Sequence, residues 1–138
     1  EAVIEGFRDG TLDNIATDHA PHTWTDKNIE FQMAPFGIIG LETSLALTIT
    51  HLVKPGHIAI EKAVELMTVG GSRVCSLGVG EVKMGGAADL CLFDPDEQWT
   101  VTKEGFGSKS ANSPYIGQTL TGRVKCTICD GNVVYRQG

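Results

Sequence analysis

Ala16-Thr17-Asp18-His19-Ala20-Pro21-His22 is the stretch that decides how the chain is interpreted. The lead-in from Asp13 to Thr17 predicts a short buried strand, which ends where an acid, two histidines and a proline begin. An acid at the carboxyl end of a buried strand is where β/α barrels place catalytic groups. Asp18 is interpreted either as a metal-bound carboxylate with a nearby histidine that contacts substrate, or as a cap for backbone N–H groups at a strand-to-loop turn.

Composition narrows the class of protein. Hydrophobic residues make up 41% of the 138 residues and charged residues 20%, as in folded globular proteins. The formal net charge is −6, and without a basic stripe to neutralise phosphates a nucleic-acid partner is not expected. No apolar run reaches the roughly 18 residues that cross a bilayer. No charged-then-apolar leader is present either, so we expect a cytoplasmic protein.

The four cysteines include the pair Cys126 and Cys129, whose spacing is shared with metal and redox motifs. The pair lies in a predicted strand, where side chains alternate between faces. Residues three apart then point in opposite directions, so both sulfurs reach one zinc ion only if the strand bulges. We expect free thiols in a reducing cytosol.

Helical spacing dominates the first part of the chain. It predicts helices over residues 1–8, 40–53 and 58–69, with a short turn over 73–77 after Gly70-Gly71-Ser72 interrupts the helical pattern. Residues 23–34 show no periodicity and predict a loop. That loop is either a segment that covers substrate or a solvated connection.

Strand-like alternation dominates the second part. A glycine-rich turn over residues 78–86 precedes predicted strands at 88–93, 99–101, 122–129 and 132–136. Residues 105–117 are irregular, and Asp130-Gly131 is a strong hairpin signal. Helices first and strands second indicate two structural regions that meet near residue 78.

Several motifs resemble those of a known family. Asp18-His19-Ala20-Pro21-His22, Ala34-Pro35-Phe36-Gly37 and Gly40-Leu41-Glu42-Thr43 are similar to the C-terminal part of dihydroorotases. More broadly they resemble cyclic amidohydrolases of the metal-dependent amidohydrolase superfamily. The resemblance continues through 80–90, 93–95, 108–110, 112–114, 122–124 and 130–131, in the same order and over nearly the whole chain.

The resemblance implies an α/β fold class. Residues 1–78 would be the C-terminal fragment of a (β/α)8 amidohydrolase barrel, comprising its last strand and the following helices. Residues 79–138 would form part of a small composite β-sandwich domain. A complete barrel needs about 250 residues, so we expect the chain to be a piece of a larger enzyme.

The resemblance also assigns site residues. Asp18 would bind a metal and act as the general base, taking a proton from the attacking water and returning it to the leaving nitrogen. His22 would donate a hydrogen bond to the substrate carboxylate, and the backbone of Phe36 and Gly37 would meet the substrate. The alternatives are a loop histidine bonded to backbone and a phenylalanine that packs in a turn. His19 is interpreted as a supporting residue.

The other metal ligands of the family have no counterpart here. They are a His-x-His pair, a bridging carboxylate and two further histidines, whereas zinc sites need three or four protein ligands. We therefore expect Zn2+ in the full-length enzyme but not in this fragment alone, which should be inactive.

The implied reaction is the reversible hydrolysis of (S)-dihydroorotate to N-carbamoyl-L-aspartate in pyrimidine biosynthesis. The second histidine, His22, favours this over an allantoinase or a hydantoinase. A different interpretation is a non-catalytic homologue that acts as a scaffold for aspartate transcarbamoylase. Aspartate transcarbamoylase is thus a candidate partner, and a homo-oligomer is expected.

Overall fold

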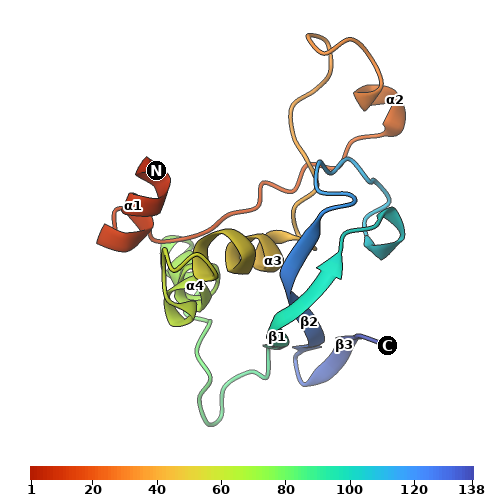
Figure 1. Cartoon of the computed structure of the whole chain (residues 1–138). Coiled ribbons are helices and arrows are strands. Elements are labelled where there is room, and N and C mark those ends of the chain that lie inside the picture. The colour runs from red at the N-terminus through yellow and green to blue at the C-terminus, as the bar shows by residue number, and fades with distance from the viewer.

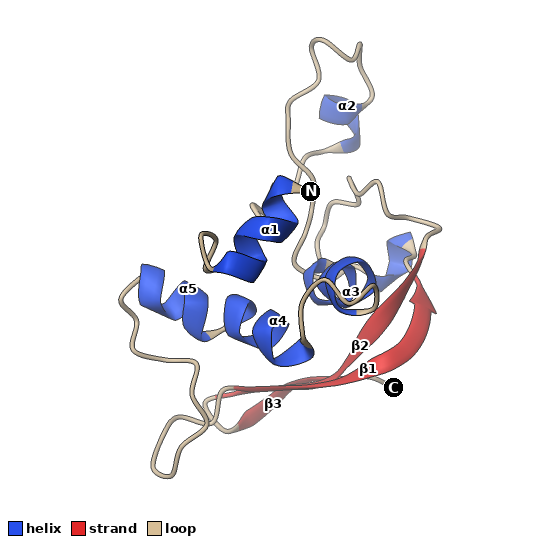
Figure 2. Ribbon diagram, turned by 60° about the vertical axis from the view of Figure 1, so that its left-hand side comes forward, coloured by secondary structure: helices blue, strands red, loops and turns tan.

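A computed structural model describes residues 1–138, in which short helices lie on one side of a three-stranded sheet (Figures 1 and 2). The helices are α1 (Ala2–Asp9), α2 (Trp24–Lys27), α3 (Ser44–Thr48), the π-helix η1 (Ile49–Val53), α4 (Ile60–Met67), α5 (Val69–Val74) and the 3-10 helix η2 (Lys103–Gly105). The strands are β1 (Leu90–Thr100), β2 (Thr119–Cys129) and β3 (Asn132–Arg136). None of the helices has the length and apolar character that crossing a bilayer requires.

The helices predicted from apolar spacing are confirmed. α1 ends at Gly10, whose left-handed backbone (φ 85°) closes the last turn. The predicted helix over 40–53 is α3 continued by η1, preceded by a turn over residues 41–43. The predicted helix over 58–69 is α4.

Two predictions in this part are wrong. Gly70, Gly71 and Ser72 do not interrupt the helical pattern but lie inside α5. Gly70 is buried, and a Cβ there would lie 2.1 Å from the Asp13 carbonyl oxygen. Glycine at this position therefore serves close packing of α5 on the Asp13 backbone, and this contact outweighs its poor helix propensity.

The strand predicted over residues 13–17 is also not formed. The segment is irregular, and the Ile15 N–H donates to the Leu66 carbonyl of α4 over 3.0 Å instead of pairing with a strand. A strand is defined by its partner, and none of β1, β2 and β3 lies beside this segment.

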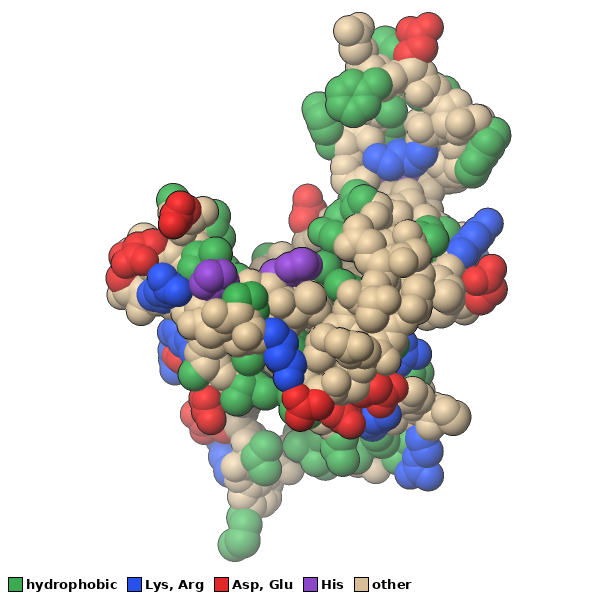
Figure 3. Space-filling model, viewed as in Figure 1, with side chains coloured by type: hydrophobic (Ala, Val, Ile, Leu, Met, Phe, Trp, Pro, Cys, Tyr) green, Lys and Arg blue, Asp and Glu red, His purple; other side chains and the backbone are tan.

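The segment over 23–34 is not wholly a loop, because it contains α2. The Thr23 hydroxyl accepts from the Asp26 N–H over 3.2 Å, and the Asp26 carboxylate accepts from the Thr23 N–H over 3.1 Å. This reciprocal capping box starts a single helical turn without any apolar periodicity. The segment projects from the rest of the molecule (Figures 1 and 3).

The sheet is antiparallel with strand order β1-β2-β3. The predicted hairpin is confirmed, and Asp130 and Gly131 both have positive φ, as its tight turn requires. The strands predicted at 88–93 and 99–101 belong to one strand, β1. Its register with β2 shifts between Asp94 and Gln98, where Pro95 has no N–H to donate.

Two small apolar clusters hold the elements together. Phe7, Ile58, Ala63 and Leu66 join α1 to α4, and Ala46, Val101 and Leu120 join α3 to the sheet. The second cluster also receives Phe106 and Tyr115, which anchor the irregular segment between η2 and β2 against α3.

The four cysteines are free thiols. Cys126 is half-buried and Cys129 is exposed at the end of β2. Cys91 on β1 is exposed, yet the surrounding sheet desolvates part of its thiol group, and this raises the pKa of the thiol.

Candidate active site

Asp18 follows the irregular lead-in and has a left-handed backbone with φ 43°. Aspartate tolerates this conformation better than most residues. Its side chain is exposed and takes part in none of the ion pairs of the chain. The carboxylate is therefore available to a ligand.

His19 bonds to the backbone of a neighbouring segment instead of facing a ligand. Its Nδ1 atom accepts from the Gly40 N–H over 3.1 Å and lies 3.4 Å from the Leu41 nitrogen. A Cβ on Gly40 would lie 3.1 Å from the Thr17 carbonyl oxygen. His19 thus ties the Asp18 segment to the start of the α3 region, consistent with a supporting role.

His22 is held at three atoms. Its backbone N–H donates to Asn112 Oδ1 over 3.1 Å, and its carbonyl accepts from the Ser110 hydroxyl. Its Nε2 atom lies 2.8 Å from the Phe36 carbonyl oxygen. A carbonyl can only accept, so Nε2 carries a proton and donates it, and Nδ1 is the ring nitrogen left to a ligand.

Phe36 and Gly37 lie directly against this histidine. The Phe36 ring is 97% exposed, so it does not pack in a turn of this chain, and only its carbonyl is engaged. Gly37 has φ 108°, and a Cβ there would lie 2.5 Å from Ala20 Cβ. Glycine is needed at this position because the two segments approach too closely for a side chain.

Asn112 joins all of these segments, although the sequence suggested no chemistry for it. Its Nδ2 donates to the Ala20 carbonyl over 2.9 Å and to the Gly37 carbonyl over 3.3 Å. Its own backbone carbonyl accepts from the Ile39 N–H over 3.2 Å. The signal that could have found it is its place among Ser110, Ser113 and Pro114 in a family-like motif of an otherwise irregular segment.

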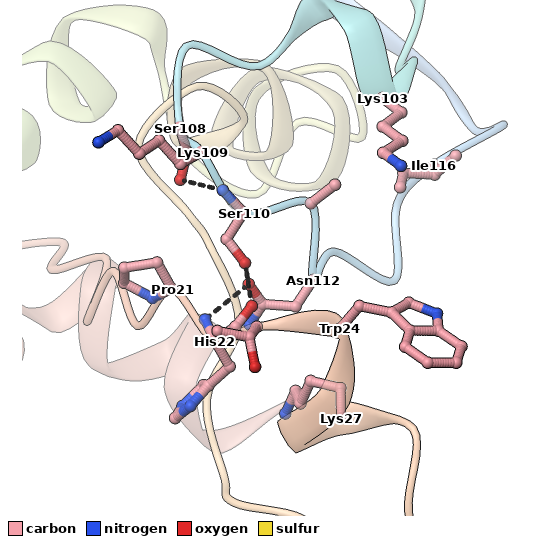
Figure 4. A pocket seen from close by; sticks show the side chains of 12 residues that line it. Pro21, His22, Trp24, Lys27, Lys103, Ser108, Lys109, Ser110, Asn112 and Ile116 are labelled. Carbon is pink, nitrogen blue, oxygen red and sulfur yellow. Dashed lines mark hydrogen bonds between the residues drawn. The ribbon is translucent and has the colours of Figure 1, made fainter.

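A cavity of about 790 Å³ opens beside His22, between the projecting segment and the 103–116 segment (Figure 4). Its lining includes three lysines and no acid: Lys27, Lys103 and Lys109. The Lys27 ammonium also donates to the Pro35 carbonyl over 2.8 Å, which closes the base of the projecting segment. Of the predicted site residues only His22 lines this cavity; Asp18, Phe36 and Gly37 do not.

The residues of this chain do not make a complete metal site. No group of three or more His, Cys, Asp or Glu side chains is placed to hold a metal ion. The free carboxylate of Asp18 fits one ligand position, whereas a zinc ion needs three or four protein ligands.

The chain belongs to the amidohydrolase family, whose sequence profile matches residues 1–134. It is similar to the dihydroorotase of Clostridioides difficile (strain 630), with 48% identity over 135 residues. The dihydroorotase of Acetivibrio thermocellus is 49% identical over 137 residues. These alignments cover 98% and 99% of this chain, but the chain spans only 32% of the length of either relative.

Solved structures of the family have the same fold. The L-hydantoinase (dihydropyrimidinase) from Arthrobacter aurescens superposes with a TM-score of 0.90 and 30% identity, over 99% of this chain and 31% of that chain. The dihydropyrimidinase from Brevibacillus agri NCHU1002 has a TM-score of 0.90 at 23% identity, over 98% of this chain and 31% of that chain, and supports the fold alone.

Proposed function

We propose that this chain is part of a zinc-dependent dihydroorotase, which hydrolyses the cyclic amide of (S)-dihydroorotate reversibly to N-carbamoyl-L-aspartate. The observation that carries the proposal is the 48–49% identity to named dihydroorotases over nearly the whole chain. The juxtaposition of His22 with Phe36 and Gly37 supports it from the structure.

In this proposal residues 1–78 belong to a (β/α)8 barrel and residues 79–138 to a small β domain. Additional polypeptide would cover surfaces that are open here, since 15 of 138 residues are buried while β3 is exposed throughout. The working enzyme would be cytoplasmic and oligomeric, with aspartate transcarbamoylase as a candidate partner.

The proposed roles follow from the chemistry of each group. Asp18 would offer its free carboxylate to the metal and move a proton from water to the leaving ring nitrogen. Zinc, completed by ligands from outside this chain, would supply hydroxide at neutral pH. His22 would donate to the substrate carboxylate from Nδ1, which requires a ring protonated at both nitrogens while Nε2 stays bound to Phe36. Gly37 would let the substrate approach the backbone.

A hydantoinase is the second candidate, because the Arthrobacter aurescens L-hydantoinase shares the fold at 30% identity. The intact protein should be assayed on dihydroorotate, hydantoin and allantoin. We expect kcat/KM for dihydroorotate to exceed the others by about a hundredfold or more, since each polar group left unpaired by a wrong substrate is costly. Preference for hydantoin or allantoin would replace the proposal with the corresponding cyclic amidohydrolase.

Asp18→Asn tests the assignment of the base. The change keeps the shape but cannot accept a proton, so turnover should fall by about a hundredfold or more. Asp13→Asn, an exposed acid nearby, is the control and should keep most activity. Absence of dihydroorotate hydrolysis by a metal-loaded wild type would favour a non-catalytic scaffold.

A further inference from the structure

One of the two ring nitrogens of His22 is already engaged in a hydrogen bond within the chain. Because Nε2 donates to the Phe36 carbonyl over 2.8 Å, the neutral ring carries its proton on Nε2. The remaining nitrogen, Nδ1, is then the only ring atom open to a ligand. The groups that hold the Phe36 carbonyl beside His22 therefore determine which ring nitrogen faces a ligand.

The amide of Asn112 holds both partners of that hydrogen bond. Oδ1 accepts from the backbone N–H of His22 over 3.1 Å. Nδ2 donates to the carbonyls of Ala20 (2.9 Å) and Gly37 (3.3 Å), one on each side of the approach. One side chain thus fixes the backbone next to His22 and next to Phe36.

Ser110 lies beside the amide oxygen, whose orientation is fixed by the backbone N–H of His22. Its hydroxyl lies 2.8 Å from Asn112 Oδ1 and also within hydrogen-bond reach of the His22 carbonyl (Figure 4). With Oδ1 engaged by the His22 N–H and facing this hydroxyl, Nδ2 faces the two carbonyls. The amide is engaged at both its oxygen and its nitrogen, so a change at either end disturbs the other.

We infer that Asn112 is the positioning residue of His22: it sets the ring orientation and keeps Nε2 on the Phe36 carbonyl, so that Nδ1 is the nitrogen with which His22 meets the substrate carboxylate. The carboxylate contact rests on the proposed function, whereas the positioning of the ring does not. Asn112 touches no reacting atom in this account and acts only through His22.

The test compares Asn112→Ala with His22→Ala and with the double variant in the intact enzyme. Binding of a carboxylate remote from the reacting amide is shared by ground state and transition state, so its loss raises KM. We expect Asn112→Ala to raise KM for dihydroorotate about tenfold with kcat within about threefold. The double variant should match His22→Ala alone, because two residues that act through one contact are not additive. Additive effects on KM, or an unchanged KM, would overturn the inference.

A second readout does not depend on turnover. Nitrogen-15 spectra of the histidine rings should give His22 as the Nε2-protonated tautomer in the wild type and as a mixture in Asn112→Ala. An unchanged tautomer in that variant contradicts the inference, even if the protein proves to hydrolyse another cyclic amide. Failure on dihydroorotate with the expected tautomer change would overturn the proposed substrate and keep the positioning role.

Two further variants guard against simple misfolding. Ser110→Ala removes one hydroxyl and should shift KM in the same direction by a smaller factor, with thermal unfolding nearly unchanged. Asn132→Ala, whose side chain only bonds the Asp130 carbonyl at 3.0 Å, is the matched control and should leave KM unchanged. If Ser110→Ala leaves both KM and the tautomer at wild-type values, the network does not position His22.

Discussion

The carboxylate of Glu42 accepts the backbone N–H of Ser108 over 3.1 Å, and the same oxygen accepts the N–H of Gly107 over 3.0 Å. Ser108 and Gly107 lie 66 and 65 positions after Glu42 in the chain. The bond therefore ties the segment that carries Asn112 to the turn before α3. A charged acceptor shared by two backbone donors is among the stronger polar contacts of the fold.

Replacing Glu42 with alanine should loosen that segment. Hydrogen bonds to a charged group contribute about 1.5–3 kcal/mol each, and the exposure of Glu42 keeps the loss near the low end of that range. Thermal unfolding should move down by a few degrees, and amide exchange over residues 107–112 should accelerate. Glu81→Ala, in the exposed glycine-rich turn, serves as control; an equal effect of both changes would refute the role of Glu42.

Gly37→Ala separates close approach from backbone strain. The added Cβ would meet Ala20 Cβ at 2.5 Å, so the two segments must move apart and the bond from His22 to Phe36 must lengthen. We expect kcat/KM to fall about tenfold or more, equivalent to about 1.4 kcal/mol.

Gly10→Ala is the matched control for Gly37. Gly10 also has positive φ (85°), but a Cβ there meets nothing within 4 Å. The change should lower stability by about 1 kcal/mol from strain alone and leave kinetics intact. Comparable kinetic losses in both variants would show that close approach at Gly37 is unimportant.

Gly70→Ala and Gly71→Ala test the helix that the sequence did not predict. The first would place a Cβ 2.1 Å from the Asp13 carbonyl oxygen and should destabilise the protein by about 1–3 kcal/mol through forced overpacking. The second meets nothing within 4 Å, and should be neutral or stabilise α5 by about 0.5–1 kcal/mol. Urea denaturation of both variants measures the difference, and the reverse order would contradict this packing.

The turn α2 should be sensitive to acid. Hydrogen bonds from the Thr23 hydroxyl and N–H hold the pKa of the Asp26 carboxyl below its usual value. A lowered pKa means that the contribution to folding is complete above about pH 4 and is lost as pH falls through the lowered pKa. Amide protection of residues 23–28 should drop over that range at low pH.

Thr23→Ala should remove this protection at neutral pH as well, because it deletes the cap. Thr25→Ala changes the same residue type inside α2 and should leave both the protection and its acid sensitivity in place. If amide protection of residues 23–28 in the wild type does not change at low pH, the capping box does not hold α2.

Cys91 should be the slower thiol towards alkylation. Its pKa is raised by desolvation, and only the thiolate reacts, so at pH 8 iodoacetamide should label it more slowly than exposed Cys75. Mass spectrometry of timed samples gives the order, and labelling in urea should equalise the two rates. Faster labelling of Cys91 in the folded protein would contradict the shift.

The sequence predicted those elements that are determined by interactions between residues close together in the chain. The apolar spacing of α1 and α4 and the Asp130-Gly131 turn act over a few residues, so they can be recognised in the sequence. The role of Gly70 could not be recognised in this way, because the carbonyl that it contacts belongs to Asp13, far from it in the sequence. The strand predicted over residues 13–17 was wrong for a related reason: a strand needs a neighbouring strand to pair with, and residue spacing does not identify that neighbour.

The candidate site divides in the same way. The motif from Asp18 to His22 is contiguous, and its chemistry can be proposed from residue types alone. Asn112 lies 90 positions from His22, and its amide became meaningful only when three segments were brought together. Its contacts are mainly to backbone atoms, which every residue has, so the types of the partner residues do not reveal them.

The projecting segment is closed at its base by the bonds from Lys27 to Pro35 and from His22 to Phe36. Its tip carries Ile29, Phe31 and Met33, all exposed. Insertions at the tip would therefore lengthen a loop whose ends are already joined, and each doubling of its length costs only about 0.6 kcal/mol. This part of the surface can therefore accept a longer loop while the frame beneath it keeps the same geometry.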